Sequence, residues 1–305
     1  MNIRPVLRPI GGGELRRSLS LLAITFYGIG TIVGAGIYTL LGKVGALSGV
    51  HLPLSFLLAG LIAAFTALSH AELCARYPES GGVAIYVHEA MRRRWLTLLT
   101  GLLIALTALV SAATLTRGFI GYLHLFVDVP DELAIVLVIL VLTAIACSGV
   151  RLSAFAVSLV TVVELLGLLY VITMGMRSPP LTGMADMFLV ESAVAVPGIV
   201  LGSFLAFYAF IGFEDMVGMA EEVKEPGRNL PRAIIIAVIV TTVLYVLVAV
   251  AALRSTSLDQ LTASSAPLAE IITRAGHPVE VIGAIGLLAV INGALVQLIM
   301  SSRLL

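Results

Sequence analysis

The stretch LLAITFYGIGTIVGAGIYTLLGKVG, residues 21–45, decides the fold that the sequence predicts. It is long and apolar enough to cross a bilayer, which takes about 20 apolar residues in a helix. Four glycines, at positions 28, 30, 34 and 36, nevertheless lie close together in its middle. Each costs a helix interior about 1 kcal/mol relative to alanine, and lipid offers no hydrogen bonds to a loosened backbone. A glycine cluster at this depth therefore needs a reason.

Two explanations for the glycine cluster are open. Gly30 and Gly34 form a small-xxx-small pair, which lets helices pack closely in a membrane. Alternatively, the helix unwinds around Val33–Ile37 and exposes backbone N–H groups to a ligand. The spacing favours neither explanation. A dinucleotide-binding loop is excluded, because Gly34 comes one position late for the GxGxxG pattern and no strand precedes it.

A second interrupted span is predicted in VPGIVLGSFLAFYAFIGFEDMVGM, residues 196–219. Gly212 follows an aromatic run and precedes the adjacent carboxylates Glu214 and Asp215. A charge at the centre of a membrane costs at least about 2.5 kcal/mol by insertion scales, so it needs a cavity, a partner or the interface. Interrupted segments at corresponding positions of two halves are typical of a transporter site between inverted repeats.

The composition places the whole chain in a membrane. Of its 305 residues, 59% are hydrophobic and 12% are charged, whereas soluble domains carry roughly 25% charged residues. An ordinary soluble protein and a disordered chain are excluded. The balance of 18 basic and 18 acidic residues also excludes a nucleic-acid binder. We predict an all-α integral membrane protein with about eight spans, at 19–41, 52–73, 96–125, 132–149, 152–174, 195–219, 231–253 and 278–300.

The basic residues predict the orientation of these spans. With the N-terminus in the cytoplasm, 13 of the 18 basic residues fall in inner segments and four in outer loops, while Arg117 lies within the third span. This is the positive-inside pattern, and it places both termini in the cytoplasm of a multi-pass plasma- or inner-membrane protein. The inner connector 74–95 ends in three arginines. It is interpreted either as an amphipathic helix on the membrane or as a solvated loop.

Several stretches resemble the amino acid–polyamine–organocation (APC) permeases. GIGTIVGAGIYTLLG (28–42) is similar to their first-span motif. FLAFYAFIGFEDMVGMAEEVKEPGRNLPRAI (204–234) resembles their sixth span and the following loop, especially in the cationic amino acid transporter branch. ARYPESGGVAIYV (75–87) and INGALVQLIMSSRLL (291–305) are also similar. The resemblance covers nearly the whole chain. It implies a LeuT-type inverted-repeat fold with discontinuous spans 1 and 6.

The resemblance also implies a function and a site. It implies secondary active transport of an amino acid, coupled to protons or run as exchange, by alternating access around a mid-membrane site between spans 1 and 6. The expected substrate-binding residues are Val33, Gly34, Ala35, Gly36, Ile37, Phe207, Tyr208, Phe210 and Gly212. Phe207, Glu164 and Glu214 are the expected gating or coupling residues. An acidic Glu214 near the pocket would suit a cationic substrate, although proton handling explains it equally well. No enzyme motif, metal site or cofactor is expected.

Glu164 departs from the family pattern. Many relatives carry a lysine at the matching position of the fifth span, whose ammonium takes the place of a sodium ion. A carboxyl group removed from water favours its protonated form. Glu164 is therefore predicted to be a protonatable coupling or structural residue. The alternative is that it pairs with a residue such as Arg117.

The length of the chain is the second departure. The predicted organisation is a cytoplasmic segment 1–18, a five-span repeat 19–174 and a partial second repeat 195–305 with spans 6–8, whereas the family has a ten-span core. Further spans, or a partner, are expected to complete the fold. Two other functions stay open: a non-transporting membrane subunit or scaffold, and an amine or polyamine permease.

Overall fold

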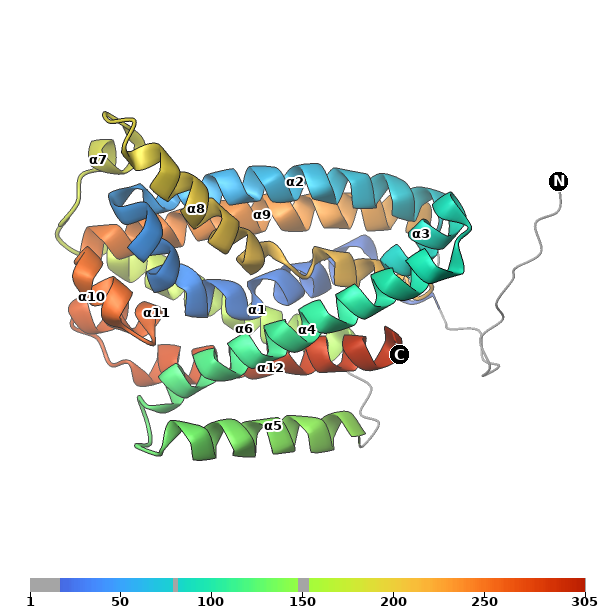
Figure 1. Ribbon diagram of the computed structural model, residues 1–305. Coiled ribbons are helices and arrows are strands. Elements are labelled where there is room, and N and C mark those ends of the chain that lie inside the picture. Colours follow the sequence, from blue (N-terminus) through green and yellow to red (C-terminus); the bar gives the residue numbers. More distant parts are fainter. Residues whose placement is uncertain (1–16, 79–81, 148–153, 305) are drawn as a thin grey trace.

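The computed structural model describes residues 17–78, 82–147 and 154–304 (Figure 1). Within this part the backbone is helical, apart from loops and one isolated bridge between Leu19 and Val223. The long helices are α1 (Leu21–Ser48), α2 (Leu52–Arg76), α4 (Arg94–Leu123), α5 (Asp131–Cys147), α6 (Ala154–Arg177), α8 (Ala195–Phe207), α9 (Pro226–Ser255) and α12 (Glu280–Leu304). The short helical segments are η1 (Gly49–His51), α3 (Gly82–Met91), α7 (Met184–Phe188), η2 (Tyr208–Phe210), η3 (Phe213–Met219), α10 (Leu258–Ala263) and α11 (Pro267–Arg274).

These helices confirm an all-α membrane architecture. Among the described residues, six stretches are long and apolar enough to cross a membrane: Gly36–Arg76, Arg94–Leu123, Val157–Arg177, Ala195–Met219, Pro226–Ser255 and Glu280–Leu298. The first of them runs from the second half of α1 into α2, and Leu21–Gly34 adds a shorter apolar helix. α5, at 17 residues, is shorter than any of these six stretches. Seven of the eight predicted spans each correspond to one long helix, and the sixth corresponds to α8 together with η2 and η3.

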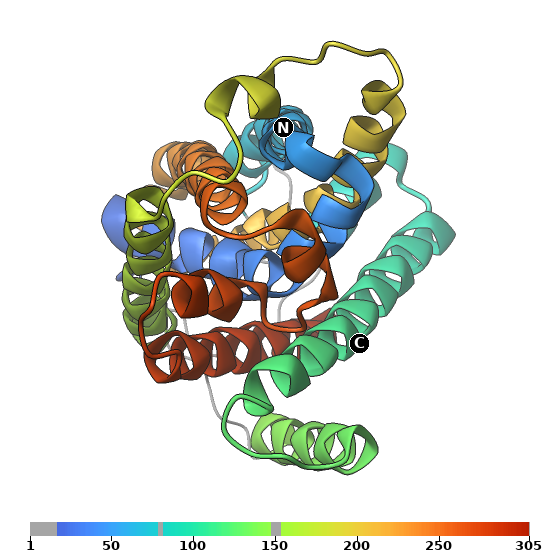
Figure 2. The ribbon, with the colours of Figure 1, turned by 90° about the vertical axis from the view of Figure 1, so that its left-hand side faces the viewer.

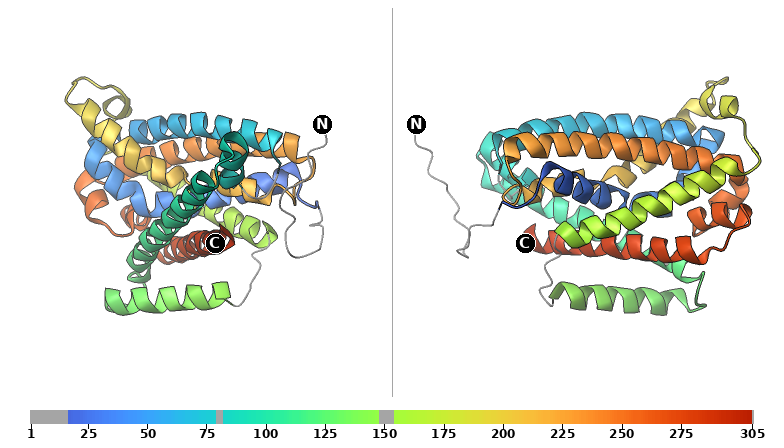
Figure 3. Two further views of the ribbon diagram at one scale, coloured as in Figure 1. Left: turned by 45° about the vertical axis from the view of Figure 1, so that its right-hand side comes forward. Right: turned by 180° about the vertical axis from the view of Figure 1, so that it is seen from behind.

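Helix α1 lies at the centre of the bundle. α2 and α9 run side by side, α4 and α12 cross in contact below α1, and α6 crosses the back (Figures 1 and 3). α5 lies apart from the centre of the bundle and packs against α4 and α12 (Figure 2). Ile24, Val33 and Leu41 of α1 are fully buried, so the middle of this helix is surrounded by protein.

The connections gather at two opposite ends of the bundle. α3, the end of α2 and the start of α9 lie at one end, while α7, α10 and α11 lie at the other (Figure 1). The connector 74–95 thus contains the short helix that one interpretation predicted, and this helix packs against α4 and η3. Tyr86 of α3 is buried, and its burial raises the pKa of its phenol.

Local sequence explains where the helices begin and end. The Ser20 side chain accepts a hydrogen bond from the Ala23 N–H at 3.3 Å and so caps the start of α1. Gly49 follows α1 with a φ of 59°, which glycine adopts without strain. Pro226 begins α9, where the missing N–H costs nothing.

The predicted interruption of the first span is wrong, because α1 is helical throughout Leu21–Ser48, including Val33–Ile37. Its glycines serve close packing instead. A methyl group on Gly30 would overlap the side chain of Thr161 on α6, and one on Gly36 would lie 2.5 Å from the Ala209 Cα. Close contact at small residues stabilises membrane helices. It offsets the cost of glycine in this helix.

The interruption of the sixth span is confirmed. The α-helix ends at Phe207, η2 follows, and Gly212 then has a φ of 130°, which side chains rarely permit. η3 continues the span beyond it. The backbone at the break is hydrogen-bonded to α1, because the Thr31 hydroxyl donates to the Gly212 carbonyl oxygen at 3.0 Å. A methyl group on Gly212 would lie 2.5 Å from the Thr31 carbonyl oxygen.

Candidate substrate-binding site

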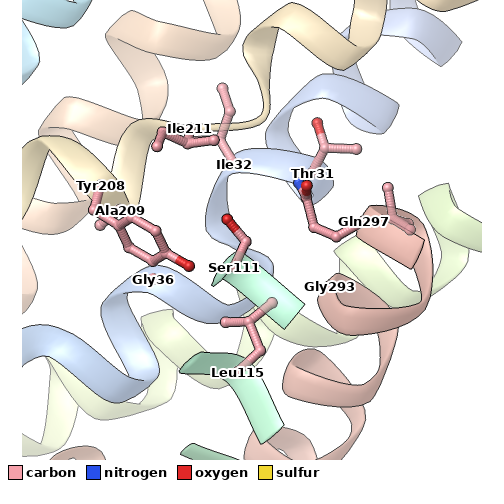
Figure 4. A pocket seen from close by; sticks show the side chains of 11 residues that line it. Thr31, Ile32, Gly36, Ser111, Leu115, Tyr208, Ala209, Ile211, Gly293 and Gln297 are labelled. Carbon is pink, nitrogen blue, oxygen red and sulfur yellow. The ribbon is translucent and has the colours of Figure 1, made fainter. Parts of the chain in front are cut away.

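A small cavity lies where the broken sixth span faces α1 (Figure 4). Its walls come from α1, α4, the η2 segment and α12. It is lined by Thr31, Ile32, Gly36, Ser111, Leu115, Tyr208, Ala209, Ile211, Gly293, Val296 and Gln297. Its volume of about 30 Å³ has room for about two water molecules. The cavity is therefore narrow, and a larger ligand requires its walls to move apart.

Two buried hydroxyl groups line the cavity without a hydrogen-bond partner among the described residues. They are the Oγ of Ser111 on α4 and the hydroxyl of Tyr208 on η2. Figure 4 shows the Tyr208 hydroxyl pointing into the cavity. A buried hydroxyl without a partner costs about 1–3 kcal/mol. Water or a polar ligand in the cavity would relieve that cost, so the site suits a small polar molecule.

Tyr245 of α9 connects the two backbone segments that flank the cavity. Its hydroxyl oxygen lies 2.9 Å from the Ile32 carbonyl oxygen and 2.8 Å from the Ala209 carbonyl oxygen. Its ring packs edge-on against Phe56 and Phe210. Sequence reasoning missed this residue, because a single tyrosine in an apolar span belongs to no motif.

The structure brings part of the predicted site to the cavity. Gly36 and Tyr208 line it. Phe210 lies behind them against Tyr245. Gly212 forms the break itself. Phe207 is half-buried and is not among the lining residues.

The other predicted residues of α1 lie beside the cavity, outside its lining. Val33 and Ile37 are fully buried in the bundle. Gly34 faces the α12 backbone near Gly293. Ala35 belongs to α1, but its side chain lies outside the described residues.

The two adjacent carboxylates beside the break have different partners. The Glu214 Oε2 accepts a hydrogen bond from the Gly212 N–H at 2.9 Å, so this side chain folds back onto the break. The Asp215 Oδ2 accepts one from the Gln297 Nε2 at 3.3 Å. Because Gln297 lines the cavity, Asp215 is the carboxylate that is joined to the cavity wall. No group of three or more His, Cys, Asp or Glu side chains in the described part could hold a metal ion.

Glu164 of α6 is fully buried. Asn292 of α12 is its polar neighbour, yet neither carboxylate oxygen makes a well-formed hydrogen bond to a described residue. The Tyr38 hydroxyl donates to the Glu164 backbone carbonyl at 3.2 Å. Arg117 is exposed on α4 and takes part in no ion pair within the described ranges. The alternative pairing of Glu164 with Arg117 is therefore wrong, since the two side chains lie in different environments.

Comparison with known proteins identifies relatives along most of the chain. A family model described as amino acid permease matches residues 23–305. An uncharacterized transporter of Mycobacterium tuberculosis is 34% identical over 278 residues, which are 89% of this chain and 61% of the relative. The mitochondrial cationic amino acid transporter 3 of Arabidopsis thaliana is 33% identical over 261 residues, 78% of this chain and 42% of the relative.

A human protein, cationic amino acid transporter 4, is 30% identical over 261 residues, 77% of this chain and 40% of the relative. The chain spans about three fifths of the length of the mycobacterial relative and about two fifths of the plant and human ones. The family and these relatives are transporters, not enzymes. Since the family match covers nearly all of the sequence, the chain belongs to the amino acid permease family of the APC superfamily.

Proposed function

We propose that this protein is a secondary amino acid transporter whose substrate binds in the cavity between α1, α4, η2 and α12. The observation that carries the proposal is the cavity at the break of the sixth span, with two unpartnered hydroxyls in its walls. Hydroxyl and backbone N–H donors suit a carboxylate, and backbone carbonyls suit an ammonium group. An α-amino acid carries both groups. The names of the plant and human relatives add support for this substrate class.

We further propose a cationic amino acid as the substrate. Asp215 is joined through Gln297 to the cavity wall. A carboxylate near a water-poor cavity attracts a positive charge more strongly than it would in water. An ammonium or guanidinium group of the substrate would therefore be favoured at the α12 side of the cavity.

The LeuT-type organisation supplies the mechanism. In this proposal residues 19–174 form one five-span repeat and residues 195–305 belong to the second, with segment 1–18 and both termini in the cytoplasm of a cell membrane. Contacts of α1 with α8, η2 and η3 at the centre of the bundle support it. One group of helices would rock against the other around the site, opening it to either side in turn.

Binding is tested by measuring the melting temperature of the purified protein with each of the twenty amino acids and with polyamines, at two pH values. Arginine or lysine is expected to raise it most, because a ligand at 100 times its Kd stabilises the native state by about 2.7 kcal/mol. Uptake of the same radiolabelled compound into proteoliposomes is expected. Stabilisation by polyamines alone would indicate an amine permease. No binding and no uptake by a correctly inserted chain would contradict the proposal and favour a non-transporting membrane subunit.

Glu164 is the proposed coupling residue, because a buried carboxyl group with no charged partner in the described part of the chain is suited to carry a proton. Glu164→Gln keeps the shape and removes the titratable proton. We expect uptake by the variant to lose its response to an inward proton gradient while exchange of amino acids persists. Glu132→Gln, which changes an exposed carboxylate on α5, is the matched control and should respond as the wild type does. An unchanged gradient response in Glu164→Gln would contradict the coupling role.

A further inference from the structure

We infer that Tyr245 is a positioning residue that keeps the cavity narrow by holding α1 to η2 through its hydroxyl group. The role of Tyr245 in transport rests on the proposed function, whereas the contacts that Tyr245 makes are independent of it. Ile32 and Ala209, whose carbonyl oxygens lie 2.9 and 2.8 Å from the Tyr245 hydroxyl, both line the cavity from different elements.

The ring of Tyr245 is held in place by two other aromatic rings. Its side chain is fully buried, and its centroid lies 5.7 Å from that of Phe56 on α2 and 5.0 Å from that of Phe210 on η2. α9, which carries Tyr245, runs along α2 over most of its length (Figure 1). A well-packed interior resists displacement of such a ring. Tyr245 is therefore a fixed point, and opening the cavity requires α1 or η2 to move away from it.

A single hydroxyl hydrogen serves both carbonyl groups. A phenol donates one hydrogen, so it makes one strong hydrogen bond at a time. Rotation about the C–O bond lets the hydrogen turn from the Ile32 oxygen to the Ala209 oxygen without movement of the ring. When one wall leaves, the hydroxyl keeps a full bond to the other. Tyr245 thus joins the two walls when the cavity is narrow and stays bonded to one of them when it widens.

The experiment measures how readily reagents reach the cavity. In a chain with Cys74→Ala and Cys147→Ala, Ser111→Cys places one thiol in the cavity wall. A small methanethiosulfonate reagent is expected to label it slowly, because the cavity of about 30 Å³ is too small for the reagent. Adding Tyr245→Phe keeps the ring and removes the hydroxyl. We expect labelling to become about tenfold faster, the factor that corresponds to loss of about one hydrogen bond.

Tyr122→Phe is the matched control. Its hydroxyl is fully buried and donates to the Tyr38 carbonyl at 2.9 Å, but Tyr122 does not line the cavity. Its removal should change the labelling rate less than about twofold. Labelling of Tyr245→Phe at the parental rate, or an equal acceleration in Tyr122→Phe, would overturn the inference. Amide hydrogen exchange in α1 gives a second measurement without any introduced cysteine, and it should be faster in Tyr245→Phe alone.

These measurements need no substrate, so they separate the inference from the proposed function. A protein that binds no amino acid but shows faster labelling in Tyr245→Phe would contradict the transport proposal and support the role of Tyr245. A protein that binds amino acids but is labelled at the same rate with and without Tyr245→Phe would support the transport proposal and contradict the role of Tyr245.

Discussion

Gly36→Ala is expected to weaken amino acid binding by about five- to 150-fold, although alanine favours helix formation. The added methyl group would lie 2.5 Å from the Ala209 Cα and 3.0 Å from the Ala209 carbonyl oxygen. These are backbone atoms, so α1 and η2 must separate to make room. Overpacking costs about 1–3 kcal/mol, which corresponds to a loss of affinity of about five- to 150-fold. Calorimetry or ligand-induced stabilisation measures the loss.

Gly45→Ala is the control for this variant in the same helix. A methyl group at Gly45 would meet its nearest neighbour, the Leu258 side chain, at an ordinary 3.5 Å. Alanine there should leave binding unchanged and raise stability by up to about 1 kcal/mol. Wild-type affinity in Gly36→Ala would contradict the assignment of Gly36 to the cavity wall.

Gly212→Ala is expected to destabilise the protein and to remove transport. Alanine is strained at a φ of 130°, and its methyl group would lie 2.5 Å from the Thr31 carbonyl oxygen. Backbone strain of this kind costs about 1–3 kcal/mol, and the contact with α1 adds to it. The melting temperature in detergent and uptake in proteoliposomes measure the two effects.

Gly276→Ala separates strain from crowding. Gly276 also has a positive φ, of 75°, but a methyl group there would meet nothing within 4 Å. This variant should lose about 1–2 kcal/mol from the backbone alone and keep full transport. Equal destabilisation by the two substitutions would show that Gly212 does not need its close approach to α1.

The fold could be predicted because each span is a long apolar run, which is recognisable without knowledge of its neighbours. Whether the first span is unwound or continuous could not be predicted. Glycine is compatible with both unwinding and close packing, and the neighbours that decide, Thr161 and Ala209, lie far away in the sequence. The break at Gly212 was easier to predict, because two carboxylates beside a glycine are costly in an uninterrupted span.

The candidate site was predictable only where a motif carries it. Gly36 and Tyr208 lie in recognisable stretches, and both line the cavity. Ser111 and Gln297 have no such signal, since they become wall residues only because α4 and α12 cross beside α1. Likewise, Glu214 and Asp215 are adjacent in sequence, and only the tertiary structure shows which of them contacts α12.

The small volume of the cavity has a consequence for pharmacology. A ligand that enters only open molecules has an apparent Kd equal to its intrinsic Kd divided by the open fraction. If one molecule in about a hundred is open, the measured potency is about a hundredfold weaker than the intrinsic one. Substitutions that loosen the walls without contacting the ligand should therefore lower the apparent Kd and shift the midpoint of the dose–response curve to lower concentration. Rigid compounds too large for the cavity of this structure should bind only with its walls apart and hold the protein in that conformation.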